Sequence, residues 1–220
     1  MLEFGAFDIV GPRMIGPSSS HTAGAARLGH IAWKIADRDV AAAVLTLYGS
    51  FAQTGRGHGT DKALTAGVLG MQPDDENLVR APDIAKERGV AVEVVYSDEE
   101  TDHPNTARLE LTGKNGARTE VVGQSLGGGA IHVVEVNGFP VEFSGEYPTL
   151  LIQHRDVPGV IQEITGILAQ NNINVAFMQV FRRRRGEDAY MVIETDQTVP
   201  RRVWDTIVEG CGNVMMVRSV

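Results

Sequence analysis

Hydroxyl side chains crowd around one histidine near the start of the chain. A Gly16-Pro17 turn signal precedes three serines, a histidine and a threonine, which are Ser18, Ser19, Ser20, His21 and Thr22. The small residues that follow predict a helix over 23–36. A helix N-terminus has unpaired N–H groups and the positive end of the helix dipole, so these hydroxyls predict a cup for a carboxylate or phosphate, with His21 able to exchange a proton near neutral pH. The alternative is a serine-capped helix whose spare hydroxyls face water.

A glycine-rich segment carries a second histidine. Four glycines occur within the eleven positions from Gly49 to Gly59, directly after an apolar stretch that predicts a buried strand at 41–48. We expect no regular element in this segment, and a helix to follow it, because glycine clusters interrupt helices and strands. The segment and its flank offer an imidazole, a hydroxyl, a carboxylate and an ammonium group, on His58, Thr60, Asp61 and Lys62. Ligands bind at such strand ends in α/β folds, although the spacing lacks the dinucleotide-binding fingerprint and a mobile surface loop is the alternative.

The second glycine cluster and the single cysteine are less specific. The glycines of 125–129 either expose N–H groups to an anion or allow close packing. Cys211 cannot form an intrachain disulfide, and one thiolate cannot hold an iron–sulfur cluster, which needs about four ligands. We interpret it as a structural thiol. The remaining histidines show no metal-ligand spacing, and they include His30, His103, His132 and His154.

The net charge is confined to the first part of the chain. It is −8 over 220 residues; the first 146 residues hold 12 basic and 20 acidic side chains, and the rest hold eight of each. An acidic body argues against nucleic acid as the main partner. No apolar run is long enough to span a bilayer, and the N-terminus lacks a secretion signal, so we expect a cytoplasmic protein without a membrane partner.

The order of the predicted elements divides the chain into two domains. The first, 1–146, is a mixed α/β domain with helices at 23–36, 60–69 and 77–88 and strands at 41–48, 90–96, 106–112, 117–122, 131–136 and 139–143. A short linker lies at Ser144-Gly145-Glu146. The second, 147–220, follows the split ferredoxin-like plan βαββαβ, with strands at 149–154, 173–181, 188–195 and 213–218. The expected fold class is α+β.

Three motifs give the chain a family resemblance. They are Gly11-Pro12-Arg13-Met14-Ile15-Gly16-Pro17-Ser18-Ser19-Ser20-His21-Thr22-Ala23-Gly24, Thr54-Gly55-x-Gly57-His58-Gly59-Thr60-Asp61 and Ser125-Leu126-Gly127-Gly128-Gly129-Ala130-Ile131. With them the chain resembles the iron–sulfur-dependent L-serine dehydratases (L-serine deaminases), and more closely the beta chain of the two-chain form. Its first domain resembles the allosteric substrate-binding domain that also occurs in some phosphoglycerate dehydrogenases.

This resemblance implies a reaction, a cofactor and a partner. The family converts L-serine to pyruvate and ammonia with a 4Fe–4S cluster, whose cysteine ligands reside in the alpha chain. The resemblance further implies catalytic roles, in contact with the substrate, for His58, Thr60 and Asp61. The hydroxyl cup is then a binding site for the substrate or for an effector, formed by Ser18, Ser19, Ser20, His21 and Thr22.

The second domain resembles the ACT domain, a small-molecule sensing module. The matching residues are Tyr147-Pro148-Thr149-Leu150-Leu151-Ile152, His154-Arg155-Asp156-Val157-Pro158-Gly159-Val160 and Asn171-Asn172-Ile173-Asn174-Val175. ACT modules often pair through their sheets and bind an amino acid at the seam, which implies a dimer and an effector site at Asp156, Gly159 and Val160. The alternative is a dimerisation platform without a ligand. The four arginines at 182–185 are expected to form a solvated turn.

The chemistry of serine leaves two classes of function. Its dehydration requires removal of the α-proton and departure of the β-hydroxyl, which a Lewis acid or pyridoxal phosphate can assist. Only one of the four lysines, Lys62, has a site-like setting for pyridoxal phosphate, and the resemblance implies the iron–sulfur cluster instead. We therefore predict, on the resemblance, the subunit of an L-serine ammonia-lyase that does not hold the cluster. The alternative is a non-catalytic sensor that binds serine and regulates another protein. A nicotinamide-dependent dehydrogenase fragment is disfavoured, because no nucleotide-binding unit is visible.

Overall fold

The computed structural model describes residues 13–220, so Gly11 and Pro12 of the first motif lie outside it. The chain divides into two compact units, one ending at Asn137 and the other beginning at Gly138. This division comes before β6 (Phe139–Phe143), whereas the predicted linker at 144–146 comes after it. Within residues 13–220, no helix combines the length and apolar character needed to cross a membrane.

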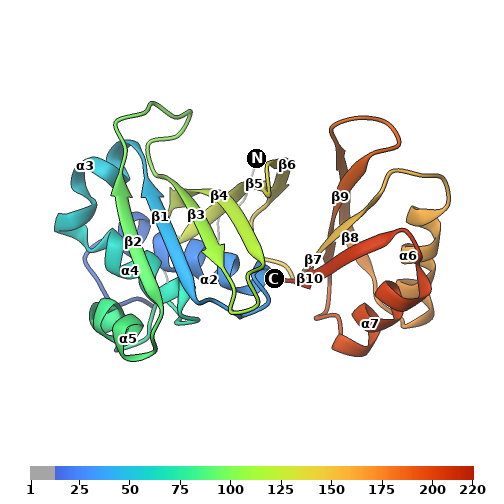
Figure 1. Cartoon of the computed structure of the whole chain (residues 1–220), viewed down its shortest axis with the longest axis horizontal. Coiled ribbons are helices and arrows are strands. Elements are labelled where there is room, and N and C mark those ends of the chain that lie inside the picture. Colours follow the sequence, from blue (N-terminus) through green and yellow to red (C-terminus); the bar gives the residue numbers. More distant parts are fainter. Residues whose placement is uncertain (1–12) are drawn as a thin grey trace. The chain divides into compact units, whose positions relative to one another are not determined.

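The first unit is a mixed sheet with helices on one face (Figure 1). Its strands lie in the order β2-β1-β3-β4-β5; β1 and β2 are parallel and the other pairs are antiparallel. They are β1 (Ala42–Leu47), β2 (Ala91–Tyr96), β3 (Thr106–Thr112), β4 (Arg118–Gly127) and β5 (Ala130–Val136). Along β1, the buried side chains of Ala43, Leu45 and Leu47 alternate with half-buried ones, because only one face of the sheet is covered. The helices on that face include α2 (Ala25–Ile35), α4 (Thr60–Val68) and α5 (Ala81–Glu87).

Two glycines let α2 and α4 cross with their backbones in contact. A Cβ atom on Gly29 would lie 2.5 Å from the carbonyl oxygen of Leu64, and one on Gly67 would lie 2.3 Å from that of Ala26. Any larger side chain would push the helices apart, because packed interiors have no room for it. The crossing therefore fixes α4, which begins at Thr60, against the helix that follows the His21 segment.

The glycine-rich segment is helical, so the prediction that it contains no regular element was wrong. Helix α3 runs from Gly49 to His58, and Gly59, with φ of +69°, ends it and leads directly into α4. A glycine inside a helix costs about 1 kcal/mol relative to alanine, but tertiary packing outweighs that cost here. At Gly49, with φ of +52°, a Cβ atom would lie 2.6 Å from the carbonyl oxygen of Pro104. Gly49 thus permits a close contact at the start of α3, and Gly59 permits the left-handed turn at its end.

Three other predicted elements differ at their ends. The first predicted helix opens with a π-helical turn, η1 (Ser19–Gly24), before α2 begins. The helix predicted at 77–88 is a 3₁₀ turn, η2 (Leu78–Arg80), followed by α5, with Pro82 in the first turn of α5. Strand β4 continues beyond the predicted end at 122 and includes Ser125. The hydroxyl and glycine residues there take part in the sheet rather than in a loop.

The second unit contains β6 and the predicted βαββαβ arrangement. Its elements are β7 (Thr149–Arg155), α6 (Val160–Gln170), β8 (Val175–Arg182), β9 (Asp188–Thr195), α7 (Arg201–Gly210) and β10 (Val214–Ser219). The four strands are antiparallel in the order β10-β7-β9-β8, with α6 and α7 on one face (Figure 1). Ile152, Ile164 and Met191 are fully buried in the core between helices and sheet. This order confirms the ferredoxin-like fold.

Cys211 belongs to the same core. It is a free thiol and 1% exposed. Burial raises the pKa of the Cys211 thiol, and the neighbouring Glu163 raises it further. A buried, protonated thiol fits the structural interpretation of this residue.

Candidate functional site

The hydroxyl segment packs directly onto β4. The Ser125 hydroxyl donates to the Ser20 carbonyl oxygen at 3.0 Å, and the Gly128 N–H donates to the Ser19 hydroxyl at 3.2 Å. A Cβ atom on Gly24 would lie 2.0 Å from the Ser125 Oγ atom. Of the two interpretations of the second glycine cluster, at 125–129, the geometry supports close packing.

His21 lies at the centre of a hydrogen-bonded cluster. Its backbone N–H donates to Ser18 Oγ at 3.1 Å, and its ring Nδ1 lies 3.0 Å from Ser20 Oγ. Its Nε2 lies 3.0 Å from Thr54 Oγ1 and 3.2 Å from Ser50 Oγ, both on α3. The Thr54 hydroxyl donates its proton to the Ser50 carbonyl oxygen at 2.9 Å, so its oxygen accepts from Nε2–H of His21.

The second histidine lies against the first. The ring centroids of His21 and His58 are 4.9 Å apart, with the ring planes inclined at 45°. Nδ1 of His58 lies 3.1 Å from the Thr54 carbonyl oxygen, which can only accept, so Nδ1 carries the proton and Nε2 keeps a free lone pair. The Thr22 hydroxyl donates to the His58 carbonyl oxygen at 3.2 Å. Two motifs more than thirty residues apart in sequence are therefore one site.

His21 is held in its neutral form. Burial lowers the pKa of His21, the nearby His58 lowers it further, and a contact with Ser50 acts in the opposite direction. Each of the cup hydroxyls, on Ser18, Ser19, Ser20 and Thr22, has a partner within the chain. The cup in this structure orders His21, and its binding of an anion stays a prediction.

A cavity of about 210 Å³ has His58 among its lining residues. It is lined by Thr22, His58 and two cationic residues, Arg56 and Lys62, over an apolar wall that includes Leu78. The volume is sufficient for a small polar molecule.

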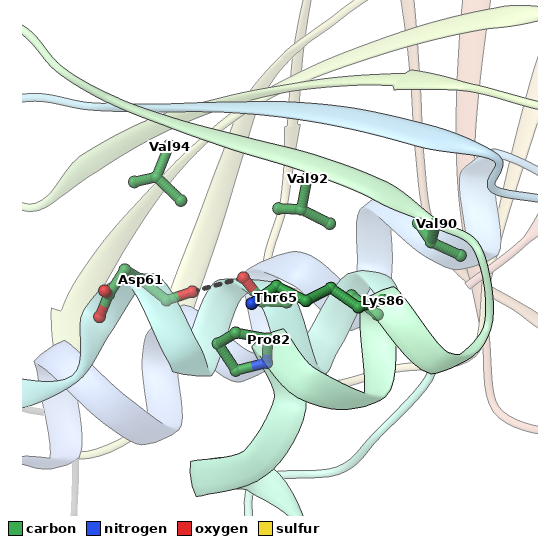
Figure 2. A pocket seen from close by; sticks show the side chains of 8 residues that line it. Asp61, Thr65, Pro82, Lys86, Val90, Val92 and Val94 are labelled. Carbon is green, nitrogen blue, oxygen red and sulfur yellow. Dashed lines mark hydrogen bonds between the residues drawn. The ribbon is translucent and has the colours of Figure 1, made fainter.

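Thr60 and Asp61 lie at the start of α4, just after His58 in the chain. Thr60 is fully buried, and its hydroxyl has no hydrogen-bond partner in the described part of the chain. Asp61 lines a second cavity, of about 180 Å³, between α4, α5 and β2 (Figure 2). There it lies at one end, with Val92 and Val94 above, while the Thr65 hydroxyl donates to its carbonyl oxygen at 2.7 Å.

Sequence reasoning missed Ser50 and Thr54 as partners of His21. Both lie on α3 one helical turn apart. The signal was present, because residues at i and i+4 share one face of a helix. It went unused because the segment was expected to be irregular.

The three candidate effector residues lie at the start of α6. The Asp156 carboxylate accepts from Arg182 at 2.9 Å and from the Gly186 N–H at 3.3 Å, and the Arg182 hydrogen bond holds the pKa of Asp156 below its usual value. Gly159 has φ of +100° and begins the helix, and Val160 is buried. Asp156 therefore ties the helix start to the arginine turn.

The residues present do not fit an iron–sulfur cluster. Across residues 13–220, no three histidine, cysteine or acidic side chains are grouped as a metal site. Cys211, the one cysteine of the chain, is protonated and enclosed in the core of the second unit.

Comparisons with known proteins give two family matches and several relatives. Residues 6–89 match the serine dehydratase beta chain family and 148–203 match the ACT domain. The chain is 42% identical over 214 residues to the probable L-serine dehydratase beta chain of Bacillus subtilis, covering 97% of this chain and 96% of that one. It is 34% identical to the L-serine dehydratase beta chain of Peptoniphilus asaccharolyticus, covering 94% of each. D-3-phosphoglycerate dehydrogenase of B. subtilis is 36% identical over 163 residues, which are 72% of this chain and 30% of that enzyme. The chain therefore belongs to the L-serine dehydratase beta-chain family and carries an ACT domain.

Proposed function

We propose that this chain is the beta subunit of a two-chain L-serine ammonia-lyase, which converts L-serine to pyruvate and ammonia. The observation that carries the proposal is the contact between His21 and His58, at 4.9 Å between ring centroids, within a chain related over nearly its whole length to serine dehydratase beta chains. The family supplies the reaction, and the histidine pair supplies a positioned base.

His58 is the proposed catalytic base. Dehydration of serine begins with loss of the α-proton, and Nε2 of His58 has the free lone pair that can take it. The bond from Nδ1 to the Thr54 carbonyl oxygen fixes this tautomer and persists when the ring becomes positively charged. Because His21 is kept neutral, it does not repel the imidazolium that His58 becomes.

The remaining predicted site residues have supporting roles in this proposal. The cup of Ser18, Ser19, Ser20, His21 and Thr22 contributes to substrate binding by ordering the His21 ring and the His58 backbone. Thr60 and Asp61 are proposed as catalytic on the family resemblance alone. Within the described residues, no contact with the histidine pair supports that role.

We propose that a 4Fe–4S cluster acts in the assembled enzyme and that the alpha chain holds it, because the donor set of this chain does not fit one. When bound, such a cluster supplies a Lewis acid for the departing hydroxyl. The residues of this chain are assigned to the substrate.

We further propose that the ACT domain pairs two copies of the chain. Strand β8 forms one edge of its sheet, and the exposed fractions of Phe177, Met178 and Val180 there are 58%, 38% and 36%. An apolar edge strand in water favours pairing with another strand. In this dimer, Asp156, Gly159 and Val160 are the proposed site for an amino-acid effector.

Anaerobic pyruvate formation from L-serine tests the proposed function. The chain is assayed alone and then with a cysteine-rich, iron-loaded candidate alpha chain from the same organism. Activity only in the mixture is the expected result. A cluster-loaded mixture without activity, in which this chain still binds serine, would instead favour the serine sensor.

A further inference from the structure

The cavity beside His58 is cationic. Arg56 and Lys62 line it together with Thr22 and His58, and no aspartate or glutamate is among its lining residues. The rest of the chain is acidic, with a net charge of −8. A small cavity that gathers positive charge on such a chain is suited to an anionic group.

The Arg56 guanidinium is held in place without an acidic partner. Arg56 lies in the last turn of α3, two residues before His58. Its Cζ atom lies 4.5 Å from the centroid of the Tyr96 ring. Among residues 13–220, no carboxylate pairs with it. Contact with an aromatic face leaves the N–H donors at the edge of the guanidinium free for a bidentate contact.

The hydroxyl cup is less suited to this contact than a cationic side chain. Its hydroxyls already hydrogen-bond within the chain, and His21 is neutral. A serine substrate brings a carboxylate, which needs an opposite charge or several donors when it leaves water. Arg56 offers both, on the same helix end as the proposed base.

We propose that the Arg56 guanidinium binds the carboxylate of the substrate, with Lys62 as a second cation across the same cavity. The proposal rests on the proposed function, because it takes an α-amino acid as the substrate. A carboxylate held by Arg56 would fix the adjacent α-carbon within the His58 cavity. Arg56 then determines specificity for α-amino acids over amino alcohols.

The assembled, cluster-loaded complex provides the test. Arg56→Met should raise the KM for L-serine roughly 10- to 100-fold with little change in kcat, the range for loss of a hydrogen bond to a charged group. Arg56→Lys should recover part of this loss, and Lys62→Met should raise the KM by a smaller factor. Calorimetry with 3-hydroxypropionate, which keeps the carboxylate and lacks the amine, should show the same order of binding constants.

Arg118→Met is the matched control, because Arg118 is exposed at the start of β4 and does not line the His58 cavity. If Arg56→Met gives the same KM and the same 3-hydroxypropionate affinity as this control, the proposal is wrong. It is also wrong if Arg56→Met weakens binding of the alpha chain while the complex that forms keeps a normal KM. A wild-type complex that forms no pyruvate contradicts the proposed function instead, and the calorimetry still decides the role of Arg56.

Discussion

At the scale of single residues, the two histidines differ in the partners of their ring nitrogens. His58 has a free Nε2 atom, whereas both ring nitrogens of His21 contact hydroxyl groups. His58→Ala should lower pyruvate formation by the two-chain complex about 10²- to 10⁴-fold, the usual contribution of a general base. Sedimentation of the mixed chains should show unchanged assembly, since the His58 side chain is not part of the core. Near-normal turnover in this variant would remove His58 from the mechanism.

The neutral state of His21 has a consequence for stability. Burial and His58 lower the pKa of His21 below 6.5 in the folded chain. The unfolded chain then binds more protons as the pH falls below 6.5, so stability is present above that pH and decreases towards acid. The thermal midpoint of the first unit should fall between pH 7 and pH 5, and His21→Gln should fall less steeply. Part of the slope should remain in the variant, because burial also lowers the pKa of His30. Identical slopes in both proteins would show that His21 does not titrate in this way.

At the scale of elements, the crossing of α2 and α4 is the contact that tolerates least change. Gly67→Ala would place a methyl group 2.3 Å from the Ala26 carbonyl oxygen, so the helices must separate. We expect a loss of about 1–3 kcal/mol in the free energy of unfolding, as for other overpacked cores. The control is Gly166→Ala on α6, where a Cβ atom meets nothing within 4 Å. That change should stabilise by about 0.5–1 kcal/mol through helix propensity. Denaturant titration measures the free energy of unfolding of both variants. Equal changes in that free energy would contradict the contact between α2 and α4.

The elements also show what sequence reasoning could reach. The βαββαβ order was predictable because its strands and helices carry apolar residues at regular spacing. Helix α3 was not, because its glycines are explained by partners far away in sequence, such as Pro104 over Gly49. With α3 read as a loop, the i and i+4 relation of Ser50 and Thr54 stayed hidden. The two histidine motifs were identified from sequence, but their contact required the fold.

At the scale of the whole molecule, the candidate site and the exposed apolar strand lie in different units. The histidine pair and the cationic cavity lie entirely in the first unit, on η1, α3 and the start of α4. The second unit contributes a sheet whose edge strand β8 is apolar on its exposed surface. The proposed chemistry and the proposed subunit pairing therefore involve residues of separate units, so we expect that each can be altered without the other.

This separation gives a prediction for the dimer. Phe177→Asp puts a charge on the exposed edge of β8, where pairing with a second copy would bury it, so the variant should sediment as a monomer at concentrations where the wild type is a dimer. Val208→Asp is the matched control, since Val208 is an exposed apolar residue of the same unit on α7, away from the edge. It should leave the dimer intact.

Because the histidine pair lies in the other unit, Phe177→Asp should keep pyruvate formation when the alpha chain is in excess. A Phe177→Asp protein that remains dimeric would place the pairing surface elsewhere, and a monomer without activity would show that the site depends on the paired ACT domains.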